Sequence, residues 1–336
     1  MEAVECRDSI ERKIKMNILN EVYNIGIIPV IKINDAKKAV PLAKALIDGG
    51  LSAAEVTFRT DAAEESIHAI SQAYPDMLVG AGTVLTIEQA QRALDAGAKF
   101  IVSPGFNPKV VKWCLDNGVT PLPGCTTPSE IEQALEMGLK VVKFFPAEQS
   151  GGLAKIKAMS APYGNVKFMP TGGVSLDNVN EYLANNKILA CGGSFMVKES
   201  YIDNDNWDEI TNLTRQAVDT MLGLEVAHIG INHENEAEAK STANMLSLVM
   251  GKSIERESEK GMFVSSYFEV MKGKGPGRCG HIAVATNNVE RAIYHLGKRG
   301  VKFNEESATF NADGTRKFIY LEEEYGGFGI HLIQKK

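Results

Sequence analysis

The sequence predicts an α/β protein, a (β/α)8 TIM barrel followed by a smaller α+β domain of paired βαβββ modules. From Ile27 to about Gly193, eight short β-rich runs alternate with amphipathic helical stretches. The last two of these runs end in pairs of glycines. Beyond Gly223 a different pattern occurs twice, a strand that leads into a helix and then into further strands. We therefore expect two domains, residues 1–222 and 223–336.

The strands of the predicted barrel are short runs bounded by Gly, Pro or helix-starting residues. Helical segments separate them, and the stretch 86–100 shows the usual signals in order, with Thr86 as N-cap and Gly97 as the stop. Eight such strand–helix units are typical of a closed parallel barrel, with an open doubly wound sheet as the alternative. The eight runs are residues 27–33, 53–60, 77–84, 99–105, 120–124, 141–147, 167–173 and 188–194.

The C-terminal domain is predicted from two segments that resemble each other, residues 227–251 and 280–300. Each begins with a strand that contains His-Ile and continues into a helix that ends at glycine. The glycine-rich stretch 273–280 joins the two copies, which together form two βαβββ units. Strand-like runs follow each helix, residues 261–272 in the first copy and 316–324 and 328–334 in the second.

Charge excludes two classes of partner. The chain has 336 residues, with 36 basic and 42 acidic side chains and a net charge of −6. From Gly223 onward the 15 basic and 15 acidic residues cancel, so the negative charge belongs to the barrel part. No basic run or patch occurs, and we expect neither a nucleic acid nor a membrane partner.

Cysteine usage indicates a reducing compartment. The five cysteines are odd in number, widely spaced and without a CxxC pair, which argues against a disulfide framework. The first 23 residues are charged throughout and contain no apolar segment for export. No apolar run reaches the roughly 18 residues of a membrane-spanning helix. We expect a cytoplasmic protein.

The chemistry of a TIM barrel is found at the C-terminal ends of its strands. There this sequence places one lysine, one glutamate and one arginine, which we expect to converge on the same mouth. The polar and glycine residues at these positions are Glu55, Thr57, Arg59, Thr83, Ser103, Lys143, Thr171, Gly172, Gly173, Gly192, Gly193 and Ser194.

Lys143 lies inside an apolar run, where an ammonium group is rarely buried without a partner. Strand alternation puts it on the same face as Phe145. We expect desolvation and the nearby cation Arg59 to lower the pKa of Lys143, which would leave a free amine able to attack a ketone. The alternative is an ordinary surface lysine with a solvated ammonium group.

Glu55 and the glycine pairs complete the predicted site. A carboxylate held between desolvation and a neighbouring cation can shuttle a proton, while the alternative for Glu55 is a simple ion pair with Arg59. The pairs in 170–174 and 191–195 follow the seventh and eighth strands, where backbone N–H groups commonly hold phosphate. The alternative for these pairs is ordinary turn glycines.

The segments EVTFRT, GAGTV, VSPGF, KFFPAE, PTGGV and GGS, in this order and spacing, resemble the 2-keto-3-deoxy-6-phosphogluconate aldolase family over roughly residues 15–220. That family also acts on 4-hydroxy-2-oxoglutarate. The resemblance implies that Lys143 forms a Schiff base and that Glu55 is the general acid and base. It assigns the substrate carboxylate to Arg59 and Thr83, the pocket walls to Pro104 and Phe145, and the distal phosphate to Thr171, Gly172, Gly173 and Ser194.

The implied activity is that of a class I aldolase, metal-free and trimeric. It would cleave 2-keto-3-deoxy-6-phosphogluconate to pyruvate and glyceraldehyde 3-phosphate, with 4-hydroxy-2-oxoglutarate as a further substrate that yields pyruvate and glyoxylate. Three alternatives stay open. They are the 6-phosphogalactonate epimer as substrate, a phosphosugar isomerase or synthase on the same fold, and a barrel that only carries the second domain.

The doubled βαβββ pattern resembles the vicinal oxygen chelate family, which includes glyoxalases. There, metal ligands come from the first and last strands of each copy. The matching positions are His228 and His281 on first strands, and Glu269 and His331 on last strands. Three imidazoles and a carboxylate suit a divalent transition metal. His331 departs from the glutamate common at its position, and a ligand-binding or assembly module remains the alternative.

Overall fold

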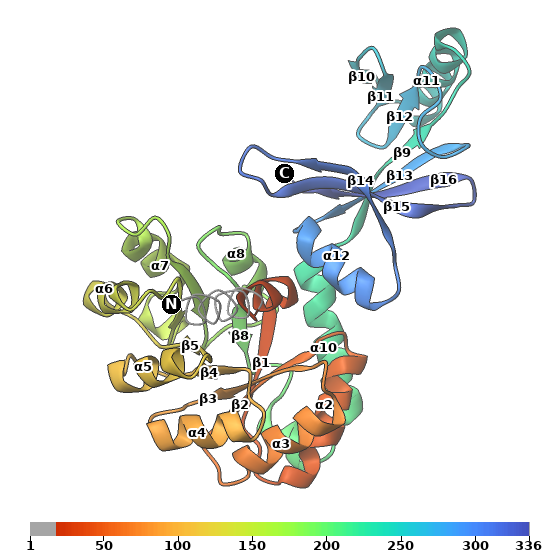
Figure 1. Cartoon of the computed structure of the whole chain (residues 1–336). Coiled ribbons are helices and arrows are strands. Elements are labelled where there is room, and N and C mark those ends of the chain that lie inside the picture. Colours follow the sequence, from red (N-terminus) through yellow and green to blue (C-terminus); the bar gives the residue numbers. More distant parts are fainter. Residues whose placement is uncertain (1–17, 336) are drawn as a thin grey trace, which may run out of the picture. The chain divides into compact units, whose positions relative to one another are not determined.

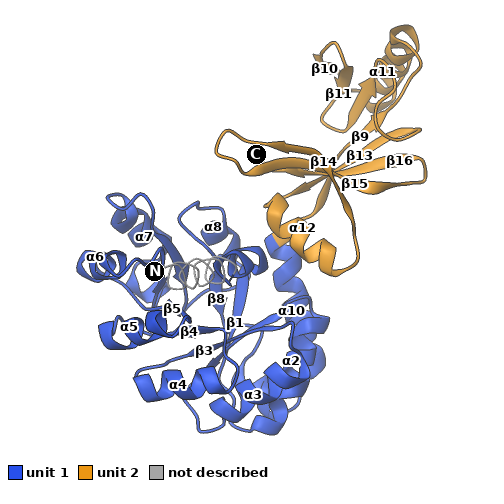
Figure 2. Ribbon diagram, viewed as in Figure 1, with its two compact units in different colours: residues 1–221 blue, residues 222–336 orange. Residues whose placement is uncertain are grey.

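The computed structural model describes residues 18–335. Its chain forms two compact units, Met1–Met221 and Leu222–Lys336 (Figure 2). Cys6 and the start of the N-terminal stretch considered above lie outside the described residues. Within residues 18–335, no helix is both long enough and apolar enough to cross a membrane.

The first unit is the predicted barrel of eight short parallel strands (Figure 1). Six of them form one sheet in the order β5-β4-β3-β2-β1-β8, and β6 pairs with β7. Single bridges, Gly124 to Lys143 and Thr171 to Gly192, join the two groups and close the circuit. The strands are β1 (Ile27–Ile31), β2 (Ala53–Thr57), β3 (Leu78–Gly82), β4 (Phe100–Val102), β5 (Thr120–Leu122), β6 (Val141–Phe144), β7 (Lys167–Pro170) and β8 (Cys191–Gly193).

Helices follow the strands, and side-chain caps start three of them, α4, α5 and α6. Thr86 accepts a hydrogen bond from the backbone N–H of Gln89, and Thr127 forms a capping box with Glu130. Gly97 has a φ of 104° just after the helix that it was predicted to stop. The helices are α2 (Ala39–Asp48), α3 (Ala63–Ala73), α4 (Ile87–Asp95), α5 (Pro108–Asp116), α6 (Pro128–Glu136), α7 (Gly152–Ser160), α8 (Val179–Leu183), α9 (Glu199–Asp203) and α10 (Trp207–Leu222).

All but one of the barrel strands are buried along their whole length, as expected for a parallel sheet covered by helices. The exception is β7, whose first residue, Lys167, is exposed. The strands are shorter than the predicted runs by two to four residues, mostly at their C-terminal ends. There the backbone leaves the sheet to form loops, and Thr83, directly after β3, has a φ of 56°. The predicted residues that lie beyond the C-terminal ends of the strands therefore form the mouth of the barrel.

The second unit confirms the paired βαβββ modules. The first module runs β9-α11-β10-β11-β12 and the second runs β13-α12-β14-β15-β16. The elements are β9 (Glu225–Ile231), α11 (Glu236–Met250), β10 (Ile254–Glu257), β11 (Gly261–Val264), β12 (Phe268–Met271), β13 (Gly280–Thr286), α12 (Val289–Lys298), β14 (Phe303–Phe310), β15 (Arg316–Tyr325) and β16 (Phe328–Gln334).

The two modules share one eight-stranded sheet in the order β10-β11-β12-β9-β13-β16-β15-β14. In each module the first and last strands are parallel, and the remaining neighbours are antiparallel. The modules meet where β9 pairs with β13 in antiparallel register. We call this pairing the seam. It brings the first strands of both modules side by side at the centre of the sheet.

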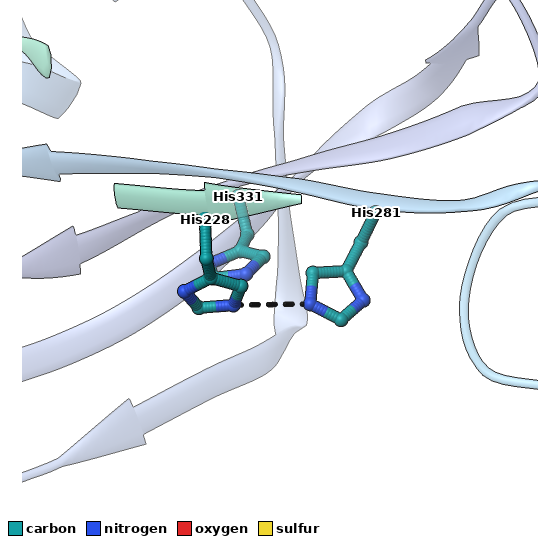
Figure 3. Close-up of side chains that lie close together, drawn as sticks. All are labelled: His228, His281 and His331. Carbon is teal, nitrogen blue, oxygen red and sulfur yellow. Dashed lines mark hydrogen bonds between the residues drawn. The ribbon is translucent and has the colours of Figure 1, made fainter. Parts of the chain in front are cut away.

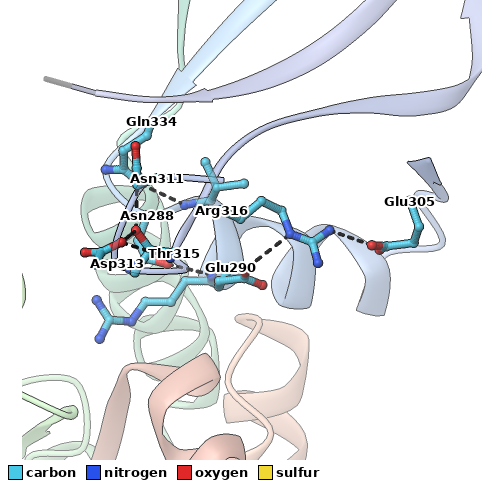
Figure 4. A network of polar contacts seen from close by, with 10 residues as sticks. Asn288, Glu290, Glu305, Asn311, Asp313, Thr315, Arg316 and Gln334 are labelled. Atoms are coloured by element: carbon cyan, nitrogen blue, oxygen red, sulfur yellow. Dashed lines mark hydrogen bonds and ion pairs between the residues drawn. The ribbon is translucent and has the colours of Figure 1, made fainter. Parts of the chain in front are cut away.

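Helices pack on this sheet through apolar and polar contacts. Ala239 and Ala243 of α11 pack against Met262, Val264 and Val270. In the second module, a polar network attaches the β14–β15 hairpin to α12 (Figure 4). The guanidinium of Arg316 forms ion pairs with Glu290 of α12 at 3.1 Å and with Glu305 of β14 at 2.8 Å.

Candidate functional site

Lys143 and Glu55 form a buried ion pair inside the barrel. Lys143 Nζ lies 3.3 Å from Glu55 Oε1, and the two side chains are 6% and 0% exposed. Glu55 Oε2 is also buried and has no hydrogen-bond partner among the described residues. A buried carboxylate oxygen without a donor is costly, so this atom is suited to a proton or a hydroxyl from a bound molecule.

Two neighbours shape this pair. A Cβ added to Gly82, the last residue of β3, would lie 2.3 Å from Glu55 Oε1, so glycine is required beside the carboxylate. Lys143 Nζ lies 5.3 Å from the ring centre of Phe145, as strand alternation predicts. Sequence reasoning missed the role of Gly82, although two glycines in a buried strand were a signal of close approach.

The structure contains no ion pair between Glu55 and Arg59, which was the alternative for this carboxylate. Arg59 is exposed, and its Nε donates to the hydroxyl of Thr57 at 3.0 Å. Among residues 18–335, the ion-pair partner of Glu55 is Lys143. The difference arises because Arg59 lies beyond the end of β2, whereas Glu55 sits in the middle of that strand. Ser103, also expected at the mouth, donates to the carbonyl of Val84 and so holds two strand ends together.

The remaining predicted residues sit in the loops that follow the strands. Thr83, directly after β3, and Pro104, two residues after β4, are half-buried, and Phe145 is 38% exposed. Thr171 is buried beside Gly192, and its hydroxyl oxygen has no hydrogen-bond partner within the described chain. A Cβ at Gly192 would lie 2.4 Å from that oxygen.

The loop after β7 contains two consecutive glycines with left-handed backbone conformations. Gly172 and Gly173 have φ values of 97° and 85°, which side chains rarely adopt. Glu148 of the KFFPAE segment packs against Gly173, and its carboxylate accepts a hydrogen bond from the buried Tyr182. Ser194 is exposed just past β8. The predicted phosphate residues thus follow adjacent strands, with Gly172, Gly173 and Ser194 reachable from solvent.

The second unit brings together the four residues predicted as metal ligands. His228 Nε2 and His281 Nε2 are 3.1 Å apart, and Glu269 Oε2 lies 3.2 Å from the first and 3.1 Å from the second. His331 joins the two other imidazoles, with donor atoms within 4.8 Å of one another (Figure 3). The three residues drawn in Figure 3 come from β9, β13 and β16.

Hydrogen bonds cannot account for all of these contacts when the imidazoles are neutral. Two Nε2 atoms carry at most one proton each, and three mutual contacts need three protons. A single cation between the three atoms would satisfy them all. Ligands bound at about 2.0–2.1 Å in tetrahedral geometry lie roughly 3.3 Å from one another. The observed spacing is close to that value, so the donor set fits a divalent metal.

Electrostatics in the cluster also fit a metal. Burial acts to raise the pKa of Glu269, but hydrogen bonds from His228 and His281 outweigh it and lower the pKa to about 2. Burial, together with the neighbouring His281 and His228, lowers the pKa of His331 to about 3. Ionised carboxylate and neutral imidazole are the forms that bind metals.

The ladder register explains why these side chains meet. Directly opposite residues point to the same face of a sheet. One row across the sheet contains Arg256, Phe263, Glu269, Gly230 and His281. The neighbouring row contains His228, Ala283, His331 and Tyr320.

Gly230 makes room for the cluster. A Cβ at this position would lie 2.1–2.5 Å from three atoms of the His281 ring. Phe318 packs against His331 with ring centres 4.3 Å apart, and Tyr320 does so at 5.0 Å. Neither Gly230 nor the aromatic residues could be identified from the sequence, because their proximity depends on strand register.

The cluster departs from well-ordered metal sites in one respect. Bound histidines usually donate their second ring N–H to an acceptor. Here the Nδ1 atoms of His281 and His331 are buried and have no hydrogen-bond partner within residues 18–335. A largely apolar cavity of about 290 Å³ borders the cluster and is lined by Val226, Ala227, His228, Ile229, Met250, Tyr267 and Phe268.

Comparison with known proteins concerns the barrel. The family described as KDPG and KHG aldolase matches residues 18–213. The chain is 51% identical over 203 residues to the 2-dehydro-3-deoxy-phosphogluconate aldolase of Treponema pallidum (strain Nichols). This match covers 60% of this chain and 97% of that protein. It is 41% identical to the KHG/KDPG aldolase of Escherichia coli (strain K12), over 57% of this chain and 91% of that protein.

Solved structures give the same result. The KDPG aldolase of Legionella pneumophila, with pyruvate captured at low pH as a covalent carbinolamine intermediate, matches with a TM-score of 0.57 and 39% identity. The match covers 58% of this chain and 96% of that chain. The aldolase of Zymomonas mobilis ZM4 with 3-phosphoglycerate matches with a TM-score of 0.56 and 38% identity, over 59% and 94% of the two chains.

Proposed function

The chain belongs to the KDPG and KHG aldolase family, and from this premise we propose that Lys143 forms a covalent imine with a 2-oxo acid inside the barrel. The enzyme is a carbon–carbon lyase, a class I aldolase that cleaves 2-keto-3-deoxy-6-phosphogluconate to pyruvate and glyceraldehyde 3-phosphate. The observation that carries the assignment of residues is the 3.3 Å contact between the buried Lys143 and Glu55.

The first half of the reaction needs a neutral amine. Glu55 is placed to accept a proton from Lys143, which frees the amine to add to the C2 ketone. Glu55 returns this proton to the hydroxyl of the carbinolamine, which leaves as water and gives a protonated imine that withdraws electrons from the C3–C4 bond. Burial of both side chains excludes bulk water from these steps.

The second half needs a base and then an acid. Glu55 takes the proton of the C4 hydroxyl, the C3–C4 bond breaks, and the aldehyde leaves. The remaining enamine is protonated at C3, and hydrolysis of the imine releases pyruvate and restores Lys143. This chemistry needs no metal, and in the KDPG aldolase of Legionella pneumophila pyruvate is captured as a covalent carbinolamine.

The loops supply substrate binding in this proposal. Arg59 and Thr83 hold the pyruvate carboxylate, and Pro104 and Phe145 line the pocket. The backbone of Gly172 and Gly173, with Thr171 and Ser194, holds the distal phosphate. The unpartnered hydroxyl oxygen of Thr171 supports its assignment. By resemblance to its family, we propose a homotrimeric, cytoplasmic enzyme.

Borohydride trapping tests the assignment. Incubation with pyruvate and borohydride should add one reduced pyruvate unit to Lys143, as located by peptide mass mapping. The Lys143→Ala variant is the control and should gain no mass. Modification at a different lysine, or none at all, would overturn the role of Lys143.

Which of the possible substrates the enzyme prefers is a separate question. We propose the phosphogluconate ester first, because the loop after β7 combines the unpartnered Thr171 hydroxyl with two glycines of positive φ that leave the backbone uncovered by side chains. The galactonate epimer and 4-hydroxy-2-oxoglutarate use the same lysine chemistry. Comparing kcat/KM for the three in the cleavage direction decides between them, and a higher value for 4-hydroxy-2-oxoglutarate would reject the phosphate assignment.

For residues 223–336, a domain distinct from the barrel at 1–222, we propose a divalent metal centre. Its ligands are His228, Glu269, His281 and His331, and the three mutual contacts of 3.1–3.2 Å support it. A bound transition metal would supply a Lewis acid for a small oxygen ligand. Metal analysis of protein dialysed against Zn²⁺ should give one ion per chain in the wild type and none in His281→Ala. Equal contents would leave a ligand-binding or assembly role instead.

A further inference from the structure

One cation on the face of the C-terminal sheet has no counterion. Arg256 of β10 is exposed, and its guanidinium carbon lies 4.0 Å from the ring centre of Phe263. No carboxylate within residues 18–335 forms an ion pair with it, and the adjacent Glu257 pairs with Lys272 instead. Stacking on an aromatic ring fixes the guanidinium while leaving its N–H donors free.

The strand register places Arg256 on the same face of the sheet as the proposed metal centre. Arg256, Phe263 and Glu269 lie opposite one another on β10, β11 and β12, so they share a face of the sheet. Phe263 in turn contacts His228 edge to face, with the two ring centres 5.5 Å apart. The guanidinium is therefore one aromatic ring away from the imidazole of His228.

Charge on this face favours an anion at the Arg256 side. Glu269 is the one formal charge among the four donors, so a divalent ion would leave the centre with a net charge of +1. Arg256 adds a second positive charge on the β10 flank. At the other end of the same row, Glu324 of β15 lies opposite Gly329 of β16. Its carboxylate makes the β15 side of this face acidic.

From these observations we propose that the C-terminal site binds a small organic anion, with the anionic group on Arg256 and a second oxygen, farther along the carbon chain, on the metal. The inference rests on the metal centre proposed above. A carboxylate or a phosphate can accept two parallel N–H donors from one guanidinium.

Cobalt(II) provides a readout of this site that is independent of aldolase turnover. The full chain is loaded with Co²⁺, and its visible absorption is followed while lactate, glycerol 3-phosphate or neutral propane-1,2-diol is added. None of the three has a ketone, so none forms an imine with Lys143. We expect saturable changes with at least one of the anions and none with the diol. The anion that binds more tightly identifies the group as carboxylate or phosphate.

Arg256→Gln tests the residue itself. We expect the dissociation constant of the anion to rise about ten- to hundredfold, with cobalt content unchanged. Arg299→Gln, at the C-terminal end of α12, is the matched control and should bind as the wild type does. Equal affinity in Arg256→Gln and wild type would overturn this inference and leave the metal centre intact. Failure of the wild type to bind cobalt would overturn both.

Discussion

The barrel and the C-terminal sheet each hold a cluster of ionisable side chains, but the two clusters differ in how their charges are compensated. In the barrel, one cation and one anion, Lys143 and Glu55, face each other in a buried pair. In the sheet, three imidazoles and a carboxylate gather around a common point without any cation among them. The first arrangement is electrically complete before a substrate arrives, whereas the second becomes complete when a positive ion is added. This difference predicts how each site responds to the loss of one member.

The largest effect is expected from Lys143→Ala. Removing the nucleophile should lower kcat of the aldolase by roughly 10⁴-fold or more, because no other group can form the imine. His281→Ala should leave the same kcat unchanged while it removes metal from the second unit. Steady-state kinetics and metal analysis of both variants measure this separation. A large loss of aldolase turnover in His281→Ala would show that the two clusters are not independent.

Glu55→Gln should lower kcat by about 10²- to 10⁴-fold, since general acid–base catalysis is lost while the shape of the side chain is kept. It also leaves a buried ammonium without a counterion, which typically costs about 3–5 kcal/mol of the free energy of unfolding. Urea unfolding measures this cost. Glu55→Gln combined with Lys143→Met should recover much of it. A double variant less stable than Glu55→Gln would contradict the ion-pair explanation.

Metal addition should act on the sheet and leave the barrel unchanged. A divalent ion at about 100 times its dissociation constant stabilises the unit that binds it by roughly 2.7 kcal/mol. Calorimetry with Zn²⁺ and with a chelator should therefore move one of two unfolding transitions. The variant Lys143→Ala should show the same shift as the wild type. A shift of both transitions would contradict the assignment of the metal to residues 223–336.

The smallest effect in this series concerns Gly230→Ala. The added methyl group would lie against the His281 ring, so metal affinity should fall about tenfold or more while the fold is kept. Gly297→Ala in α12 is the matched control, because nothing lies within 4 Å of its added Cβ. That control should keep full metal affinity and gain about 0.5–1 kcal/mol of stability. Isothermal titration of both variants with Zn²⁺ gives the comparison, and unchanged affinity in Gly230→Ala would remove the role of glycine there.

The two regions also differ in how far the sequence predicts them. In the barrel, local motifs specify both the strands and the residues that follow them, so the eight strands and the proximity of Lys143 and Glu55 were predictable. What was not predictable is the pairing of those two groups in preference to Arg59. The choice depends on how far each residue lies from the end of its strand, and the runs of apolar residues overestimate strand length.

In the sheet, the sequence predicts the first strand of each module, the runs that contain β11, β12, β15 and β16, and the four donors, but it misses β10, β14 and the neighbours of the donors. Arg256 and Phe318 lie on strands far from His228 in sequence, and only the hydrogen-bond register places them on one face. A shift of one residue in that register would turn every side chain of a strand to the opposite face. Composition and periodicity contain little information on register, which explains why Gly230 and Arg256 were missed.

The seam between β9 and β13 has a consequence for dissecting the protein. The first module contributes His228 and Glu269, and the second contributes His281 and His331, so each module supplies two of the four metal donors. Cleaving the chain in the loop between β12 and β13 would give fragments that each lack a complete coordination sphere. Such fragments would recover metal binding only by complementation, when β9 of one fragment pairs again with β13 of the other.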